Sequence, residues 1–160
     1  MVENNKTIII KLIFIISVIA LASAFFIEYI LGHQPCNLCI LERIPYLLAI
    51  IIIMMNYKFS HIEKHLILFL ILIFLAATIL SLYHLGIEQG FIEESLVCDL
   101  KNGSNLLSKE DILKQLQQKN VSCQDVTFKI FGLSLTSYNI ILSLLMCITT
   151  TKIYFNYDKS

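Results

Sequence analysis

The chain has 160 residues, of which 57% are hydrophobic and only 15% are charged. Ordinary soluble domains carry roughly 25% charged residues, so this composition, with apolar residues gathered in long runs, indicates a membrane protein. Its 12 basic and 12 acidic side chains give a net charge of zero. The sequence has no basic stripe, which argues against a nucleic-acid partner.

The first apolar run follows a polar start that contains Lys6 and Lys11. With Lys11 snorkelling to the surface, residues 7–27 are long enough to cross a hydrocarbon layer of ~30 Å. A cleaved signal peptide is the alternative, because the small residues Ala22-Ser23-Ala24 resemble a cleavage site. The apolar run continues for three residues beyond that site, which favours an uncleaved helix.

Three more apolar runs predict three more helices, over about residues 40–57, 66–85 and 130–153. Segments 28–39 and 86–129 connect the helices on one side of the membrane. We therefore expect a single integral membrane domain over residues 1–160. Its fold class is an all-α bundle of four transmembrane helices.

The distribution of lysines predicts the orientation of this bundle. Four crossings place both termini on the same side of the membrane. Lysines flank the termini and the short connection near residue 60, namely Lys6, Lys11, Lys58, Lys64, Lys152 and Lys159. The positive-inside rule therefore predicts cytoplasmic termini, and the segments 28–39 and 86–129 face outward.

The long outer segment contains one further predicted element. Ser108 to Asp111 resembles a capping box, and the apolar residues that follow predict a weakly amphipathic helix over about 109–119. Cys98 and Cys123 bracket it. They could form a structural staple or an exchange-active disulfide that faces soluble partners.

Cys36 and Cys39 form a Cys-x-x-Cys pair where the second apolar run begins. A zinc half-site is one interpretation, but zinc would need a second close pair of ligands, which the sequence lacks. A dithiol–disulfide couple is favoured, because the pair is predicted at a helix start on the oxidising side. A helix N-terminus and a nearby cation both stabilise a thiolate.

Arg43 is the only arginine in the chain. If the run is helical from Cys36 onward, Cys36, Cys39 and Arg43 fall at i, i+3 and i+7 on one face. Arg43 could then hold a thiolate and an electron acceptor between the helices. It could equally snorkel to the outer interface and pair with Glu28 or Glu42.

Three other residues in the apolar runs stand out. Pro45 is expected to kink the second helix. His84 lies at the outer end of the third run, either as an interfacial residue or as a hydrogen-bond or proton partner for a cofactor. Cys147 lies deep in the fourth run and is interpreted as an inert packing residue.

Taken together, these motifs resemble those of the disulfide bond formation protein B (DsbB) family of bacterial inner-membrane thiol oxidases. The matching strings are Cys36-Asn37-Leu38-Cys39 with Glu42-Arg43, Tyr83-His84-Leu85-Gly86-Ile87-Glu88, the pair Cys98 and Cys123, and Phe131-Gly132-Leu133-Ser134. The resemblance spans essentially the whole chain. It implies a multi-pass protein of the bacterial inner membrane.

The resemblance also implies a route for electrons. A reduced periplasmic thioredoxin-fold protein similar to DsbA would attack a Cys98–Cys123 disulfide, with Cys98 forming the mixed disulfide. Cys123 would then reduce the Cys36–Cys39 bond.

From Cys39 the electrons would pass to bound ubiquinone or menaquinone. By family position Arg43 binds the quinone and His84 sits near it. No metal is expected.

Two competing functions remain. A vitamin K epoxide reductase-like enzyme is also a four-helix, quinone-linked protein, but its loop cysteines precede the Cys-x-x-Cys pair, whereas Cys36 and Cys39 come first here. A non-catalytic four-span scaffold would use disulfides only as staples. Within the DsbB-like interpretation, a dedicated partner could replace a general one.

Overall fold

The computed structural model describes residues 2–58, 63–93, 122–124, 129–130 and 132–157. Its helices are α1 (Val2–Tyr29), α2 (Asn37–Leu41), α3 (Ile44–Lys58), α4 (Glu63–Glu88) and α6 (Leu135–Tyr157), and its two short strands are β1 (Lys129–Ile130) and β2 (Leu133–Ser134). The predicted helix over 109–119 lies outside the described residues.

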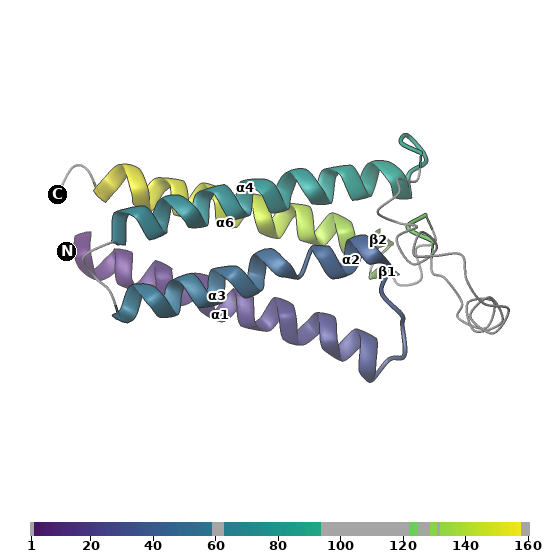
Figure 1. The fold of residues 1–160 in the computed structure, drawn as a ribbon, viewed down its shortest axis with the longest axis horizontal. Helices are drawn as coiled ribbons and strands as arrows, with labels where there is room; N and C mark the ends of the chain where they lie inside the picture. Colours follow the sequence, from purple (N-terminus) through teal and green to yellow (C-terminus); the bar gives the residue numbers. More distant parts are fainter. Residues whose placement is uncertain (1, 59–62, 94–121, 125–128, 131, 158–160) are drawn as a thin grey trace, which may run out of the picture.

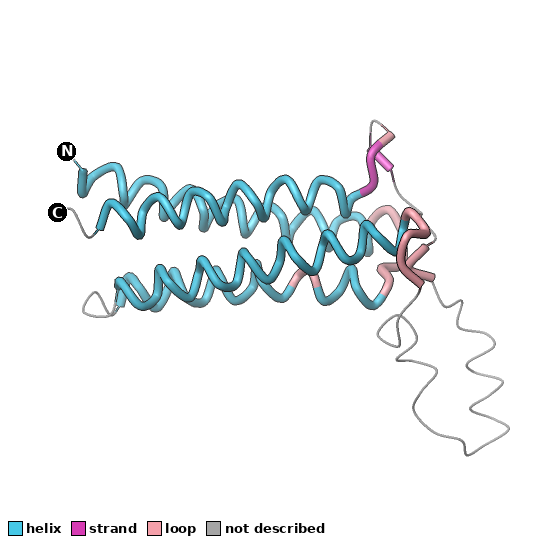
Figure 2. Tube along the Cα trace, turned by 90° about the horizontal axis from the view of Figure 1, so that it is seen from above, coloured by secondary structure: helices cyan, strands magenta, loops and turns pink. Residues whose placement is uncertain are grey.

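The long helices run side by side along the longest axis of the molecule (Figure 1). Among the described residues, four helical segments are long and apolar enough to cross a membrane, namely Lys6–Tyr29, Asn37–Tyr57, Glu63–Glu88 and Leu135–Asn156. The predicted all-α, four-span membrane bundle is therefore confirmed. Both ends of the chain lie at one end of the bundle, and the strands and most loops gather at the other (Figures 1 and 2). We call these the terminal end and the loop end.

The second span is broken, and the break precedes the expected kink at Pro45. Helix α2 ends at Leu41, and the chain turns at Glu42 and Arg43 before α3 begins. Pro45 is the second residue of α3, where its missing N–H has no intrahelical partner to lose. Because of this break, the residues after Leu41 do not continue the helical face on which Cys36 and Cys39 lie.

The fourth span begins at Leu135, five residues later than the predicted start at 130. The preceding residues form a two-residue antiparallel hairpin in which Lys129 pairs with Ser134. Gly132 has φ +82° in its turn, a conformation that favours glycine. Ser134 then caps α6, because its hydroxyl accepts a hydrogen bond from the Ser137 backbone N–H at 3.3 Å.

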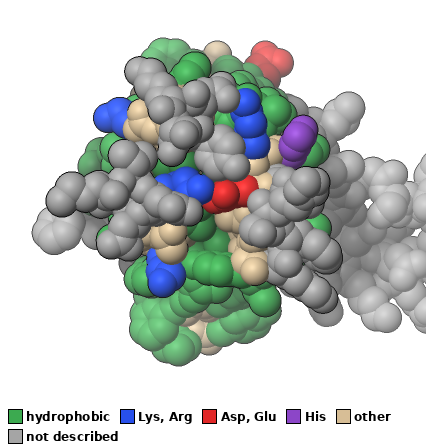
Figure 3. All heavy atoms as spheres, turned by 90° about the vertical axis from the view of Figure 1, so that its left-hand side faces the viewer, with side chains coloured by type: hydrophobic (Ala, Val, Ile, Leu, Met, Phe, Trp, Pro, Cys, Tyr) green, Lys and Arg blue, Asp and Glu red, His purple; other side chains and the backbone are tan. Residues whose placement is uncertain are grey.

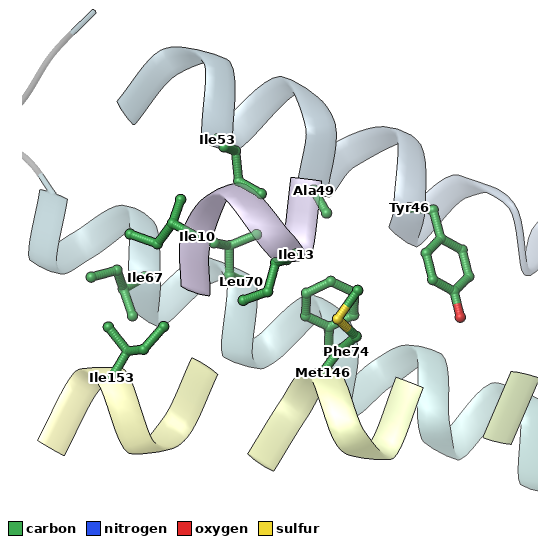
Figure 4. Packing of buried hydrophobic residues seen from close by; sticks show 10 residues of the cluster. All are labelled: Ile10, Ile13, Tyr46, Ala49, Ile53, Ile67, Leu70, Phe74, Met146 and Ile153. Carbon is green, nitrogen blue, oxygen red and sulfur yellow. The ribbon is translucent and has the colours of Figure 1, made fainter. Parts of the chain in front are cut away.

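Apolar side chains from α1, α3, α4 and α6 meet in one core (Figure 4). Its buried members are Ile10, Ile13, Tyr46, Ala49, Ile53, Ile67, Leu70, Phe74, Met146 and Ile153. Large apolar side chains on the outward faces, such as Phe69 and Met54, are exposed, as expected for surfaces that meet lipid.

Polar contacts between helices add to this packing. The Tyr46 hydroxyl donates to the Asn139 side chain, and the Asn139 amide donates to Ser81 Oγ at 2.8 Å, so α3, α6 and α4 are joined. At the terminal end, Lys6 pairs with Glu63 at 2.9 Å, and Lys64 lies over the ring of Tyr154. Figure 3 looks at this end, where basic and acidic side chains lie among apolar ones.

We expect Phe74→Ala to destabilise the bundle. Phe74 is fully buried and its ring meets the Tyr46 ring edge-on at 6.3 Å. Truncating a buried phenylalanine leaves a cavity that costs about 3–5 kcal/mol in soluble proteins. Denaturant unfolding in detergent micelles measures the loss, and Phe69→Ala on the exposed face of the same helix is the matched control. Equal losses in the two variants would contradict the assigned core.

Candidate active site

Cys36 stands at the N-cap of α2, as the sequence predicts for the first cysteine of the pair. Its sulfur accepts a hydrogen bond from the Cys39 backbone N–H at 3.2 Å. Cys36 is 6% exposed, Cys39 is half-buried, and both carry free thiols. The helix start therefore holds one sulfur in place and leaves an N–H donor pointing at it.

His84 of α4 connects the pair to the rest of the bundle. Its Nε2 lies 3.5 Å from Cys36 Sγ, and its Nδ1 lies 3.0 Å from Glu42 Oε1. His84 is only 2% exposed and Glu42 is 9% exposed. With the pair reduced and Cys36 ionised, the ring donates through both nitrogens, from Nδ1–H to the carboxylate and from Nε2–H to the sulfur. The three side chains form a buried hydrogen-bonded triad of sulfur, imidazole and carboxylate.

The pKa of the Cys36 thiol is lowered from its ordinary value of 9.0 to about 5. The hydrogen bond from the Cys39 side chain is the largest cause, burial opposes it, and the hydrogen bond from the His84 ring lowers the pKa further. A thiolate stabilised in this way favours the reduced form of the pair, which makes its disulfide a stronger oxidant.

The structure brings Cys123 to the pair. Cys123 is disulfide-bonded and 3% exposed, and it packs in one buried cluster with Cys36, Leu38 and Ile87. Cys98 lies outside the described residues. A disulfide-bonded sulfur therefore lies close to a dithiol that is 84 positions or more away in the sequence.

Arg43 contacts α1. Its guanidinium pairs with the Glu28 carboxylate and lies 5.1 Å from the centre of the Phe25 ring. The pairing with Glu28 that the sequence allowed is observed, and the role of Arg43 toward an electron acceptor stays a prediction. Because the helix breaks at residues 42–43, the predicted i, i+3, i+7 stripe is interrupted. Arg43 and Cys39 nevertheless line the same cavity.

A second polar network, which the sequence did not predict, reaches His84 from α6. Thr136 Oγ1 lies 3.3 Å from His84 Nδ1 and donates to Glu88 Oε1 at 2.9 Å. The Ser134 hydroxyl donates to the other oxygen of Glu88 at 2.7 Å. His84 and Glu88 are four residues apart on one helix, and this spacing is the sequence signal that could have linked them.

A cavity of about 420 Å³ opens beside these residues, between α1, α3 and α6. Apolar side chains of α1 and α6, such as Ile16, Ala20 and Leu142, line much of it. Its polar lining includes Glu28, Cys36, Cys39, Glu42, Arg43, Tyr46, His84, Glu88, Cys123 and Asn139. Cys147 instead packs against the apolar core, consistent with the expected packing role.

Metal binding is the other chemistry that this site could support. One ligand atom each from Cys36, Cys39 and His84 lie within 4.8 Å of one another. A structural zinc site normally has four protein ligands. The sequence-based expectation of a thiol site without metal stays a prediction.

We expect the reduced protein to keep a thiolate down to a pH of about 5. Because the folded pKa lies below the ordinary 9.0, thiolate stabilisation is fully present above about pH 9, declines below it and is lost as the pH falls through about 5. Thiolate absorbance near 240 nm measures the midpoint. Cys39→Ala should raise it because the largest cause is removed, and Cys147→Ala should not. A native midpoint near 9 would contradict the assigned contacts.

Comparisons with known proteins identify the family of this chain. The sequence profile of the family described as "Disulfide bond formation protein DsbB" matches residues 6–153. An uncharacterized protein of Rickettsia prowazekii (strain Madrid E) is 32% identical over 166 residues, which cover 99% of this chain and 94% of the relative. No solved structure matches. The chain belongs to the DsbB family, whose members are membrane thiol oxidases of disulfide bond formation.

Proposed function

We propose that this membrane thiol oxidase reoxidises a periplasmic DsbA-like dithiol protein and passes the electrons through two cysteine pairs to a membrane quinone. The observation that carries the proposal is the packing of the disulfide-bonded Cys123 in one buried cluster with Cys36. A stapled scaffold has no need to bury a disulfide sulfur beside a free dithiol. In this proposal the protein lies in the bacterial inner membrane with both termini in the cytoplasm.

The exchange steps balance in atoms and electrons. A partner thiolate attacks Cys98, which forms the mixed disulfide and releases Cys123. Cys123 attacks Cys36 of the Cys36–Cys39 disulfide and releases Cys39. The partner's second thiol then releases Cys98, which attacks Cys123 and frees Cys36. The partner ends as a disulfide, the Cys98–Cys123 bond is restored, and two electrons with two protons remain at the Cys36–Cys39 pair.

The surroundings of Cys36 suit its role as a leaving group. When Cys98 attacks Cys123, Cys36 leaves as a thiolate, and the Cys39 amide and the His84 ring both donate to that sulfur. Glu42 fixes the orientation of the ring through Nδ1. The arrangement therefore stabilises the charge that develops on the departing sulfur.

The cavity beside the pair has the character that a quinone requires. Its apolar lining from α1 and α6 suits a ring and a hydrocarbon tail, and Cys39 and Arg43 are among the polar residues of the same lining. Arg43 is the residue that would hold a carbonyl oxygen, and His84 lies near it on the cavity wall. When bound, ubiquinone or menaquinone supplies an acceptor for two electrons and two protons.

We expect oxidation of a reduced DsbA-type partner by the purified protein to require a soluble quinone. Cys36→Ala, Cys39→Ala, Cys98→Ala and Cys123→Ala should each abolish turnover, because each removes one sulfur of the relay. Cys147→Ala is the matched control, since Cys147 packs in the core. Partner fluorescence and quinone absorbance follow the two half-reactions. Turnover without quinone, or full activity of the Cys39 variant, would refute the mechanism.

We expect Arg43→Ala to act mainly on quinone use. Loss of one charged hydrogen bond costs about 1.5–3 kcal/mol, so the quinone concentration at half-maximal rate should rise roughly 10-fold or more. Titration of quinone at saturating partner measures this change. Lys152→Ala, an exposed cation on α6, is the control. An unaltered quinone dependence would leave Arg43 as an ion-pair partner of Glu28 alone.

A further inference from the structure

Glu88 has a set of contacts that the thiol exchange steps leave unexplained. It is the last residue of α4, and both of its carboxylate oxygens accept hydroxyl hydrogen bonds from the start of α6. One of those hydroxyls, on Thr136, also lies 3.3 Å from His84 Nδ1. The carboxylate is thereby joined, through one hydroxyl, to the ring that meets Cys36.

We propose that Thr136 and Glu88 form a proton relay that loads and unloads His84 at Nδ1 as Cys36 is released and oxidised again. The proposal rests on the thiol oxidase function proposed above. Glu88 and Thr136 reach Cys36 only through His84, so they are positioning and proton-transfer residues.

The distances give a continuous path. It runs from Cys36 Sγ to His84 Nε2 at 3.5 Å, from Nδ1 to Thr136 Oγ1 at 3.3 Å, and from that hydroxyl to Glu88 Oε1 at 2.9 Å. His84 and Thr136 are almost completely buried, whereas Glu88 is half-buried and is followed by the exposed Gln89. The path therefore leads from the buried sulfur to water at the loop end.

The proton steps balance with water as the source and the sink of the proton. While the pair is oxidised, the neutral ring carries its hydrogen on Nε2, and Nδ1 accepts from the Thr136 hydroxyl. When Cys36 is released as a thiolate, Glu88 takes up a proton from water and passes it to the Thr136 hydroxyl, which passes its own to His84 Nδ1, and the imidazolium then faces the thiolate through Nε2–H. When Cys36 is oxidised, its negative charge disappears. The Nδ1 proton then returns through Thr136 to the Glu88 carboxylate and on to water.

Glu42 is the other acceptor at Nδ1, but it fits a different role. It lies 3.0 Å from that nitrogen and is 9% exposed, whereas Glu88 is half-buried at the end of α4 and closer to water. Other titratable or charged groups line the same cavity as His84, namely Glu28, His33, Cys36, Cys39, Arg43, Tyr46 and Tyr138. Glu42 holds the ring, and Glu88 exchanges the proton.

A purely structural role for Glu88 is the rival explanation. A carboxylate at the N-terminus of α6 is favourable for the helix dipole and would tie α6 to α4. This role predicts lower thermal stability after substitution, but no defect in proton movement. The test must therefore measure the proton itself.

The experiment uses the full chain in detergent, with Cys98, Cys123 and Cys147 replaced by alanine, so that Cys36 and Cys39 are the only thiols. An aromatic disulfide of the dithiobis(nitrobenzoate) type oxidises the reduced pair in a stopped-flow instrument. Its two product thiols stay ionised at neutral pH, so the reaction releases one proton from Cys39 and one from His84. The colour of the product reports oxidation, and an indicator in lightly buffered solution reports the protons.

We expect both protons to appear with the colour in the parent protein. In Glu88→Ala and Thr136→Val the second proton should lag by about 100-fold, within the range for a lost acid–base group. Formate should abolish the lag in Glu88→Ala, because the shortened side chain leaves room for a small carboxylate. Thr136→Ser keeps the hydroxyl and should behave as the parent does. Thr150→Val, a buried threonine on the same helix that bonds only to backbone carbonyls, is the matched control.

Each result decides the proposal. If both protons appear together with the colour in Glu88→Ala and Thr136→Val, the proposal is overturned. It is also overturned if formate leaves the lag in Glu88→Ala unchanged and the melting temperature of that variant is lower. If Glu88→Ala does not fold, the comparison of Thr136→Val with Thr136→Ser decides. The measurement uses neither quinone nor partner protein, so the relay and the proposed oxidase function can fail separately.

Discussion

The contact between Cys36 and His84 is the interaction on which the rest of the site depends. It joins α2 to α4 across the bundle, and it fixes the sulfur of a short helix that has only five residues of its own. A sulfur, an imidazole and a carboxylate that are buried together must satisfy one another, since unpaired polar groups in this environment are costly. The break after α2 follows from this need, because Glu42 turns toward His84 while Arg43 turns toward α1.

The apolar runs predicted the four spans because a membrane helix needs about 20 apolar residues and little else. They did not predict where each helix begins or breaks. The start of α6 at Leu135 depends on a hairpin whose strands are two residues long, and the interruption at residues 42–43 depends on where two neighbouring side chains find partners. Both are tertiary effects that leave a weak trace in hydropathy.

Some features of the candidate site were predictable from the sequence, and others were not. Spacing placed Cys36 and Cys39 together at a helix start, and the structure has them there. Thr136 is 52 positions from His84, and no local pattern links the two. Arg43 stands out in the sequence, but its role does not follow from it. A cation near a membrane surface is expected both for a snorkelling residue and for a residue that contacts a ligand. Its pairing with Glu28 satisfies the charge, and its place on the cavity wall keeps it available to a ligand.

Redox chemistry and proton movement meet at His84 because its two nitrogens face different neighbours. Nε2 meets the sulfur, and Nδ1 meets both Glu42 and Thr136. A thiolate that appears and disappears in a buried site changes the local charge by one unit each cycle, and such a change is costly unless a compensating charge moves with it. A ring that gains and loses a proton through its far nitrogen supplies that charge without placing the proton on the reacting sulfur. The same geometry that stabilises Cys36 as a leaving group therefore requires an exit for a proton, and the half-buried Glu88 is the acid that reaches the loop end.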